Sequence, residues 1–181
     1  MLSLLVLLLP FSHFILPAEA YDELYEAVHF LPINPTPVGC DGLSGNFANL
    51  DTKMIRPLKP SESVIFTGKV ADKPDFMHID MVVSEPQPAI AMQIFQDFIT
   101  NSTMYNSSQN RFWDIPEFGG PIFFAGKSYE IKILYTGHVF DVYSGNKKVH
   151  TYVMRTPPCT ILNFINTGGN HTTNWIGIEC S

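Results

Sequence analysis

Three acidic residues, Asp97, Asp114 and Glu117, lie close in the sequence to the aromatic residue Trp113. Hydrolysis of a glycoside requires two carboxyl groups on opposite sides of a cleft, and these are the only acids near this aromatic segment. The sequence does not define the distance between them. It also contains no G-x-S-x-G nucleophile motif, no P-loop and no G-x-G-x-x-G motif. These residues therefore give no positive support for catalysis.

The histidines and cysteines do not follow a metal-binding pattern. The histidines after the first twenty residues are His29, His78, His138, His150 and His171. They form neither an H-x-x-x-H helix motif nor a Cys/His cluster. We expect them to be ordinary surface or strand residues, and we expect neither a metal nor another cofactor.

The first twenty residues are rich in Leu, Val, Phe and Pro and end in Ala18-Glu19-Ala20. An apolar stretch followed by an A-x-A pattern is typical of a signal peptide with its cleavage site. A membrane anchor is the alternative, but Pro10 and Pro17 interrupt the stretch, which is shorter than the roughly 20 residues of a spanning helix. We expect residues 1–20 to be removed and the protein to be secreted, without membrane insertion.

Secretion changes the interpretation of the cysteines and asparagines. Cys40, Cys159 and Cys180 allow one intramolecular disulfide, and the third sulfur is either buried or links two chains in a homodimer. Three N-x-S/T motifs begin at Asn101, Asn106 and Asn170. We expect at least one of these asparagines to carry a glycan.

The chain has 181 residues, which without the signal peptide is enough for one domain. Residues 21–53 contain many Pro and Gly residues and read as an N-terminal extension, in which only residues 23–30 favour a short helix. The net charge is −6 and the sequence has no cluster of Lys and Arg, so nucleic acid is not an expected partner.

From residue 54 onward, short runs rich in β-branched and aromatic residues alternate with Gly, Pro, Asn or Ser. The predicted strands are 63–70, 76–83, 89–100, 103–107, 128–135, 139–143, 148–154, 160–166 and 174–180. In the second, Met77, Ile79, Met81 and Val83 share one face, whereas Phe76, His78 and Asp80 share the other. Tyr143-Ser144-Gly145-Asn146 reads as a hairpin turn. This pattern predicts an all-β, two-sheet antiparallel sandwich with little helix.

The order and spacing of these strands resemble the galectin carbohydrate-recognition domain over residues 54–181. The resemblance rests on several segments: Pro57-Leu58-Lys59-Pro60, Val64-Ile65-Phe66-Thr67-Gly68, Phe123-Phe124-Ala125-Gly126, Phe140-Asp141-Val142-Tyr143 and Ile161-Leu162-Asn163-Phe164. It implies a jelly-roll-like, concanavalin A-like sandwich that binds sugars without performing a reaction.

Asn106 followed seven residues later by Trp113 matches an Asn and a Trp of the galectin sugar site. There the indole packs on the apolar face of galactose, and the amide binds a hydroxyl.

The chain also departs from the family pattern. Galectins carry a His-x-Asn-x-Arg triplet on one strand, with all three side chains on the same face. The aligned residues here are Gln93, Phe95 and Asp97. An arginine fork thus becomes a carboxylate that only accepts hydrogen bonds, and an amide becomes an apolar ring. We expect weak or altered galactoside affinity.

Two further residues complicate the expected site. The family has Gly-x-Glu after the Trp, whereas this chain has Asp114-Ile115-Pro116-Glu117. Glu117 is therefore displaced by one residue and reaches a sugar only if the loop shifts. Asn106 is itself a glycan acceptor, and a glycan there would block the pocket.

The sequence supports two hypotheses of different classes. In the first, the domain binds glycans or glycoproteins with Gln93, Phe95, Asp97, Asn106, Trp113 and Glu117; Gln93, Asp97 and Asn106 form hydrogen bonds and Trp113 stacks. In the second, the sugar site has decayed, and the same sandwich is an extracellular protein-interaction or structural module. Phe95 favours the second hypothesis, and Asn106 with Trp113 favours the first.

Overall fold

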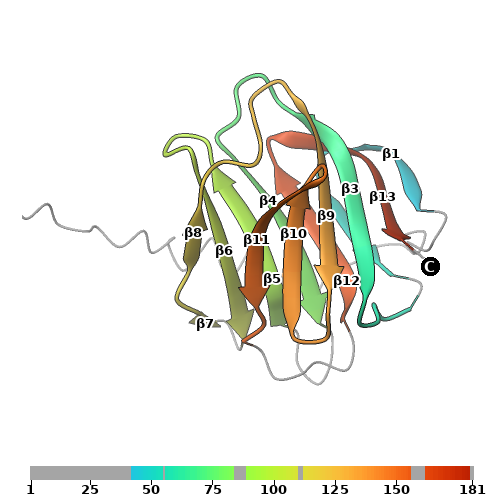
Figure 1. Ribbon diagram of the computed structural model, residues 1–181. Helices are drawn as coiled ribbons and strands as arrows, with labels where there is room; N and C mark the ends of the chain where they lie inside the picture. The colour runs from blue at the N-terminus through green and yellow to red at the C-terminus, as the bar shows by residue number, and fades with distance from the viewer. Residues whose placement is uncertain (1–41, 55, 84–88, 110–111, 156–161, 180–181) are drawn as a thin grey trace, which may run out of the picture. The chain divides into compact units, whose positions relative to one another are not determined.

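In a computed structural model, the chain forms β-strands, many of them where apolar and polar side chains alternate in the sequence (Figure 1). It describes residues 42–54, 56–83, 89–109, 112–155 and 162–179. Within these ranges the chain forms two antiparallel sheets and no helix. The predicted all-β sandwich is therefore confirmed. The expected helix at 23–30 and all three cysteines lie outside the described residues.

The first sheet has six strands. In spatial order they are β1 (Leu43–Phe47), β13 (His171–Glu179), β3 (Glu62–Val70), β9 (Ser128–Tyr135), β10 (Val139–Ser144) and β11 (Lys147–Val153). Gly145, with φ of 55°, makes the tight connection between β10 and β11. This confirms the predicted hairpin, because only a residue tolerant of positive φ fits such a two-residue turn.

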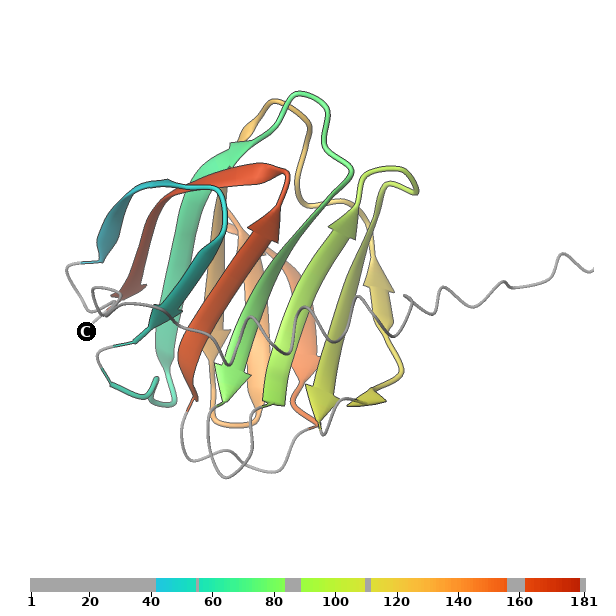
Figure 2. The ribbon, with the colours of Figure 1, turned by 180° about the vertical axis from the view of Figure 1, so that it is seen from behind.

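The second sheet has seven strands. Their spatial order is β2 (Leu50–Lys53), β12 (Leu162–Gly169), β4 (Phe76–Val83), β5 (Ala89–Asp97), β6 (Ser102–Gln109) and β7 (Phe112–Trp113), while β8 (Glu117–Gly119) also pairs with β6. Figure 2 shows β12, β4, β5 and β6 side by side.

The core lies between the two sheets. Met77, Ile79 and Met81 of β4 are fully buried, as are Ile131 and Ile133 of β9. Since successive side chains of a strand point to opposite faces, the alternate residues of β4 must point outward. The alternation predicted for 76–83 is therefore confirmed, and it defines an outer face of the seven-stranded sheet.

The structure adds strands that the sequence pattern did not predict. Residues 21–53 were expected to be an irregular extension, but β1 and β2 fall inside that range. Leu43 pairs with Ile176 of β13, and Asp51 pairs with Asn166 of β12. These short segments, both largely polar, become strands because each completes the edge of a sheet. In the described residues, no helix is long and apolar enough to cross a membrane.

Candidate functional site

Side chains on the outer face of the seven-stranded sheet are arranged in rows. Residues directly opposite each other in an antiparallel pair share a face, so the strand register identifies each row. One row contains Asp51 on β2, Asn166 on β12, Asp80 on β4, Gln93 on β5 and Asn106 on β6. We call these five amides and acids the polar row.

Gln93 and Asn106, two of the predicted sugar ligands, face each other across β5 and β6. They are only 4% and 3% exposed. The Gln93 side chain hydrogen-bonds Asp80, and Asn106 Oδ1 accepts a hydrogen bond from the Ser107 backbone N–H at 2.9 Å. An amide both donates and accepts hydrogen bonds, as a sugar hydroxyl does. The pair is thus suited to hydroxyl recognition and is held in place by its neighbours.

The rest of the polar row forms a partly buried network together with His78 of β4. His78 Nε2 lies 2.8 Å from Asn166 Oδ1 and 3.9 Å from Asp80 Oδ2. Asn166 Nδ2 donates to the Asp51 carboxylate. Burial raises the pKa of Asp80, and the charge of Asp51 adds to that effect, while His78 and Gln93 oppose it.

Asp80 Oδ1 is buried and has no hydrogen-bond partner in the structure. Across the described part of the chain, no three His, Cys, Asp or Glu side chains are grouped to hold a metal ion.

A second row lies two residues along each strand from the polar row. It contains Gly168 on β12, His78 on β4, Phe95 on β5, Met104 on β6 and Phe118 on β8. We call Phe95, Met104 and Phe118 the apolar row. The predicted site residue Phe95 therefore lies beside the polar row, on the same face.

Trp113 lies on the same face as the polar row. It pairs with Ser108, two residues after Asn106 on β6, and is half-buried. The indole is therefore on the outer face at the edge of the sheet, two residues along β6 from Asn106, and not between the sheets. The neighbouring Phe112 pairs with Gln109 and is 79% exposed on the opposite side.

Asp97 is on the outer face, but its carboxylate is bound to the β5–β6 turn. Asp97 Oδ1 accepts hydrogen bonds from the Ile99 and Thr100 backbone N–H groups at 2.7 and 3.3 Å. Asp97 Oδ2 accepts another from Thr100 Oγ1 at 2.9 Å. A short Asp side chain commonly closes a turn in this way. The contacts give Asp97 a local structural role.

Glu117 is not brought to the polar row. It pairs with Tyr105, whose ring is buried on the inner side of the sheet. Its carboxylate lies 3.0 Å from His150 Nε2 and 2.5 Å from Arg155 Nη2. A shift of one residue along a strand moves a side chain to the other face. The displacement of this acid by one residue therefore separates it from Gln93 and Asn106.

The family model for galactoside-binding lectins matches residues 49–176. The chain belongs to this family. Its members, the galectins, are carbohydrate-binding lectins that perform no reaction. The match begins between β1 and β2, so it includes β2 and leaves β1 outside. A search of curated proteins finds no match.

Solved galectin structures share this fold at low sequence identity. Galectin LEC-6 of Caenorhabditis elegans superposes with a TM-score of 0.70 at 12% identity, covering 77% of this chain and 96% of that one. Sheep galectin-11 gives 0.63 at 13% identity, covering 71% and 96%. A variant of human galectin-16 gives 0.61 at 18% identity, covering 71% and 93%.

The three glycosylation motifs of this galectin have different environments. Asn101 is exposed in the β5–β6 turn with φ of 53°, a conformation that Asn tolerates well. Asn106 is buried in the polar row. Asn170 is partly buried, and its Oδ1 accepts hydrogen bonds from the Asp75 and Phe76 backbone N–H groups at 2.8 and 3.3 Å. Asn101 is thus the most accessible acceptor.

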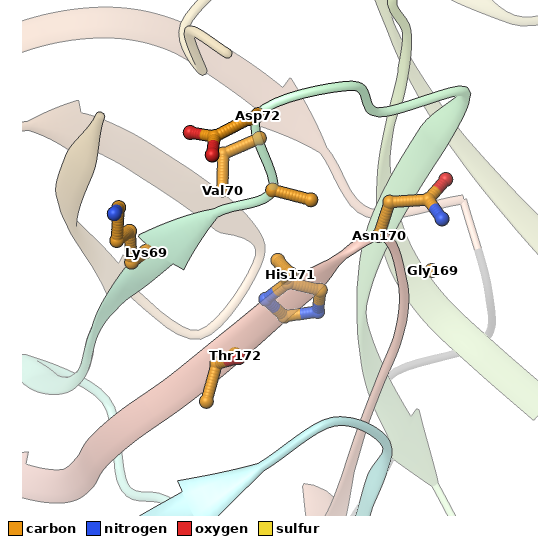
Figure 3. Close-up of a pocket in the computed structure, with 8 residues that line it drawn as sticks. Lys69, Val70, Asp72, Gly169, Asn170, His171 and Thr172 are labelled. Carbon is orange, nitrogen blue, oxygen red and sulfur yellow. The ribbon is translucent and has the colours of Figure 1, made fainter. Parts of the chain in front are cut away.

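A cavity of about 330 Å³ lies at the junction of β3 and β13 (Figure 3), and no member of the two rows lines it. It is lined by Lys69, Val70, Ala71, Asp72, Gly169, Asn170, His171 and Thr172. Burial lowers the pKa of His171 to about 4. Its Nδ1 lies 2.8 Å from the Tyr129 hydroxyl, while its Nε2 is buried without a hydrogen-bond partner. None of the predicted sugar ligands lines this cavity.

Several residues of the two rows were not among the predicted ligands. They are Asp51, His78, Asp80, Met104, Phe118 and Asn166. The outward alternation of His78 and Asp80 was visible in the sequence, but their pairing with Phe95 and Gln93 was not. That pairing depends on the register between β4 and β5.

Proposed function

We propose that this galectin binds neutral glycans on the outer face of the seven-stranded sheet, with the amides of Gln93 and Asn106 contacting hydroxyl groups and Trp113 stacking on a sugar ring. The observation that carries the proposal is the placement of this amide pair directly opposite each other, with the indole beside it. A face that combines a few fixed polar groups with an aromatic ring is typical of sugar sites.

We further propose that simple β-galactosides bind more weakly than they do to a galectin with the full ligand set. Phe95 and Asp97 occupy positions that the family resemblance gives to sugar-binding polar residues, and Asp97 is already bound to the turn. Glu117 is bound to Arg155 and His150. Each lost hydrogen bond reduces binding by about 1 kcal/mol.

The Trp113→Ala variant tests the position of the site. It is expected to weaken binding of any recognised glycan at least tenfold, roughly 1.4 kcal/mol, because ring stacking would supply much of a reduced contact set. The measurement is titration calorimetry with the strongest ligand from a glycan array. Phe112→Ala is the matched control, since this ring is adjacent but points the other way. Equal affinity of the Trp113→Ala variant and the native protein would contradict the assignment.

A protein-interaction module is the second candidate function. It is favoured by the exposed rings of the outer face, since Phe118 is 69% and Phe76 is 41% exposed. Exposed apolar groups of this size commonly mark contact surfaces. A glycan array on which neither the native protein nor its deglycosylated form binds would favour this candidate.

We also propose that the protein is secreted, that it begins near Tyr21, and that its glycan is on Asn101. The exposure of Asn101 and the burial of Asn106 support this choice of acceptor. Intact mass of protein secreted from eukaryotic cells, before and after glycosidase treatment, is expected to reveal a glycan that the Asn101→Asp variant lacks. Asp also tolerates the positive φ of the turn. A glycan retained in that variant would place the modification elsewhere.

A further inference from the structure

The apolar row lies parallel to the polar row on the proposed glycan site. Residues two apart on a strand are roughly 7 Å apart, so the two rows are separated by about the width of a sugar ring. Phe95 follows Gln93 on β5 by two residues, and Met104 precedes Asn106 on β6 by two. A ring bound to the amide pair would therefore place its opposite edge over Phe95 and Met104.

The rings of this face are arranged to present apolar surface. Phe76 stacks on Phe95 with a centroid distance of 5.7 Å and an interplanar angle of 14°. Phe118, on the other side of Met104, is largely exposed. A sugar hydroxyl buried against these side chains would lose its water without gaining a hydrogen bond, which costs free energy. A methyl group at the same position would instead gain from burial.

The charges of the face also restrict the ligand. Among the described residues that the register places in the two rows, none is Lys or Arg, whereas Asp51 and Asp80 are acidic. Asp97 adds a third carboxylate on the same face, opposite Phe76. Sulfated or carboxylated sugars would therefore find no Lys or Arg in these rows, where His78 is the one basic side chain among the described residues, and would be repelled by the three carboxylates.

We propose that this site selects neutral sugars that carry a methyl group, such as an O-methyl ether, on the ring edge opposite the hydroxyls held by Gln93 and Asn106. This inference rests on the proposed glycan-binding function. It adds Phe95, Met104 and Phe118 as specificity-determining residues that contact the methyl-bearing edge.

The test compares matched probes on the full secreted protein. The probes are methyl β-galactoside, methyl β-glucoside, the complete set of their mono-O-methyl ethers, and one sulfated galactoside. Affinity is measured by NMR titration. At least one ether is expected to bind about fourfold more tightly than its parent, the factor expected for burial of one methyl group. The sulfated probe is expected to bind most weakly.

The Phe95→Ser and Phe118→Ser variants assign that preference to the apolar row. Each is expected to bring the affinity ratio of ether to parent close to one, because any loss of affinity that the two probes share cancels in this ratio. Phe124→Ser is the control, because Phe124 is an exposed ring outside both rows and should leave the ratio unchanged.

The outcomes separate this inference from the function on which it rests. If parents and ethers bind equally and Trp113→Ala abolishes both, the glycan site is correct and the methyl selectivity is wrong. If the preference persists in both serine variants, the apolar row is not its source and the inference fails. If no probe binds but the glycan array identifies a ligand whose binding Trp113→Ala abolishes, the inference alone fails. If the array also shows no ligand, the proposed glycan-binding function fails together with the inference.

Discussion

Replacing Gln96 with leucine is expected to lower the free energy of unfolding by about 4 kcal/mol. Gln96 is fully buried on the inner side of β5. Its Oε1 accepts hydrogen bonds from the Ile122 and Phe123 backbone N–H groups, both at 2.9 Å, and from Thr103 Oγ1 at 3.1 Å. Its Nε2 donates to the Phe123 carbonyl at 2.7 Å. One amide thus holds the segment before β9 against β5 and β6.

The leucine fills a similar volume but leaves these four partners without hydrogen bonds. Each unpaired buried polar group costs about 1–3 kcal/mol, and partial relaxation reduces the sum. Urea denaturation followed by tryptophan fluorescence measures the change. Gln109→Leu, at an exposed position on β6, is the control and should change stability by less than about 0.5 kcal/mol. A loss below about 1 kcal/mol for Gln96→Leu would contradict the role assigned to Gln96.

The second large effect is expected from acid. Burial is the main cause that lowers the pKa of His171 from 6.5 to about 4, and the charge of His78 acts in the same direction. At pH values between these two pKa values, His171 therefore carries a proton in the unfolded chain but not in the folded chain. Folded stability falls as the pH decreases through this window, by up to about 3 kcal/mol. Below about pH 4 this contribution no longer changes.

Two carboxyl groups of the polar row act in the opposite sense. Burial raises the pKa of Asp80 and of Asp51 above the usual 3.8, so each is more readily protonated in the folded chain and favours folding as the pH falls. The His171→Gln variant isolates the histidine contribution. Its stability, measured by urea denaturation from pH 7 to pH 4, is expected to decrease less than that of the native protein.

His138→Gln, at an exposed position between β9 and β10, is the matched control for this comparison. It should follow the pH profile of the native protein. If the His171→Gln and native profiles are parallel between pH 6.5 and 4, His171 does not carry the acid sensitivity.

Local residue patterns were sufficient to predict most of the strands. In β4 the alternation of Met77, Ile79 and Met81 with His78 and Asp80 predicted both the strand and its two faces, because side-chain direction in a strand depends only on sequence spacing. Gly145 likewise marked the β10–β11 turn. The separation of Asn106 and Trp113 matched that of the galectin sugar site, and the structure has both residues on the outer face.

Other features depended on contacts between distant segments. The sequence of β1 and β2 has no strong strand pattern, and these segments become strands through pairing with β13 and β12. Asp97 was predicted to bind a sugar, but its carboxylate accepts hydrogen bonds from the adjacent turn. The backbone geometry of the turn determines this contact.

The two rows of the outer face also combine features set by local spacing with features set by strand register. Alternation predicted which residues of β4 and β5 point outward, but the register between the strands determined that Asp80 faces Gln93 and that His78 faces Phe95. Glu117 was separated from the site by a displacement of one residue, which moved its side chain to the face of Tyr105. The spacing of residues along a strand is a local property, and it specifies the face. Register is set by the packing of both sheets around one core, so only the tertiary structure determines which side chains meet.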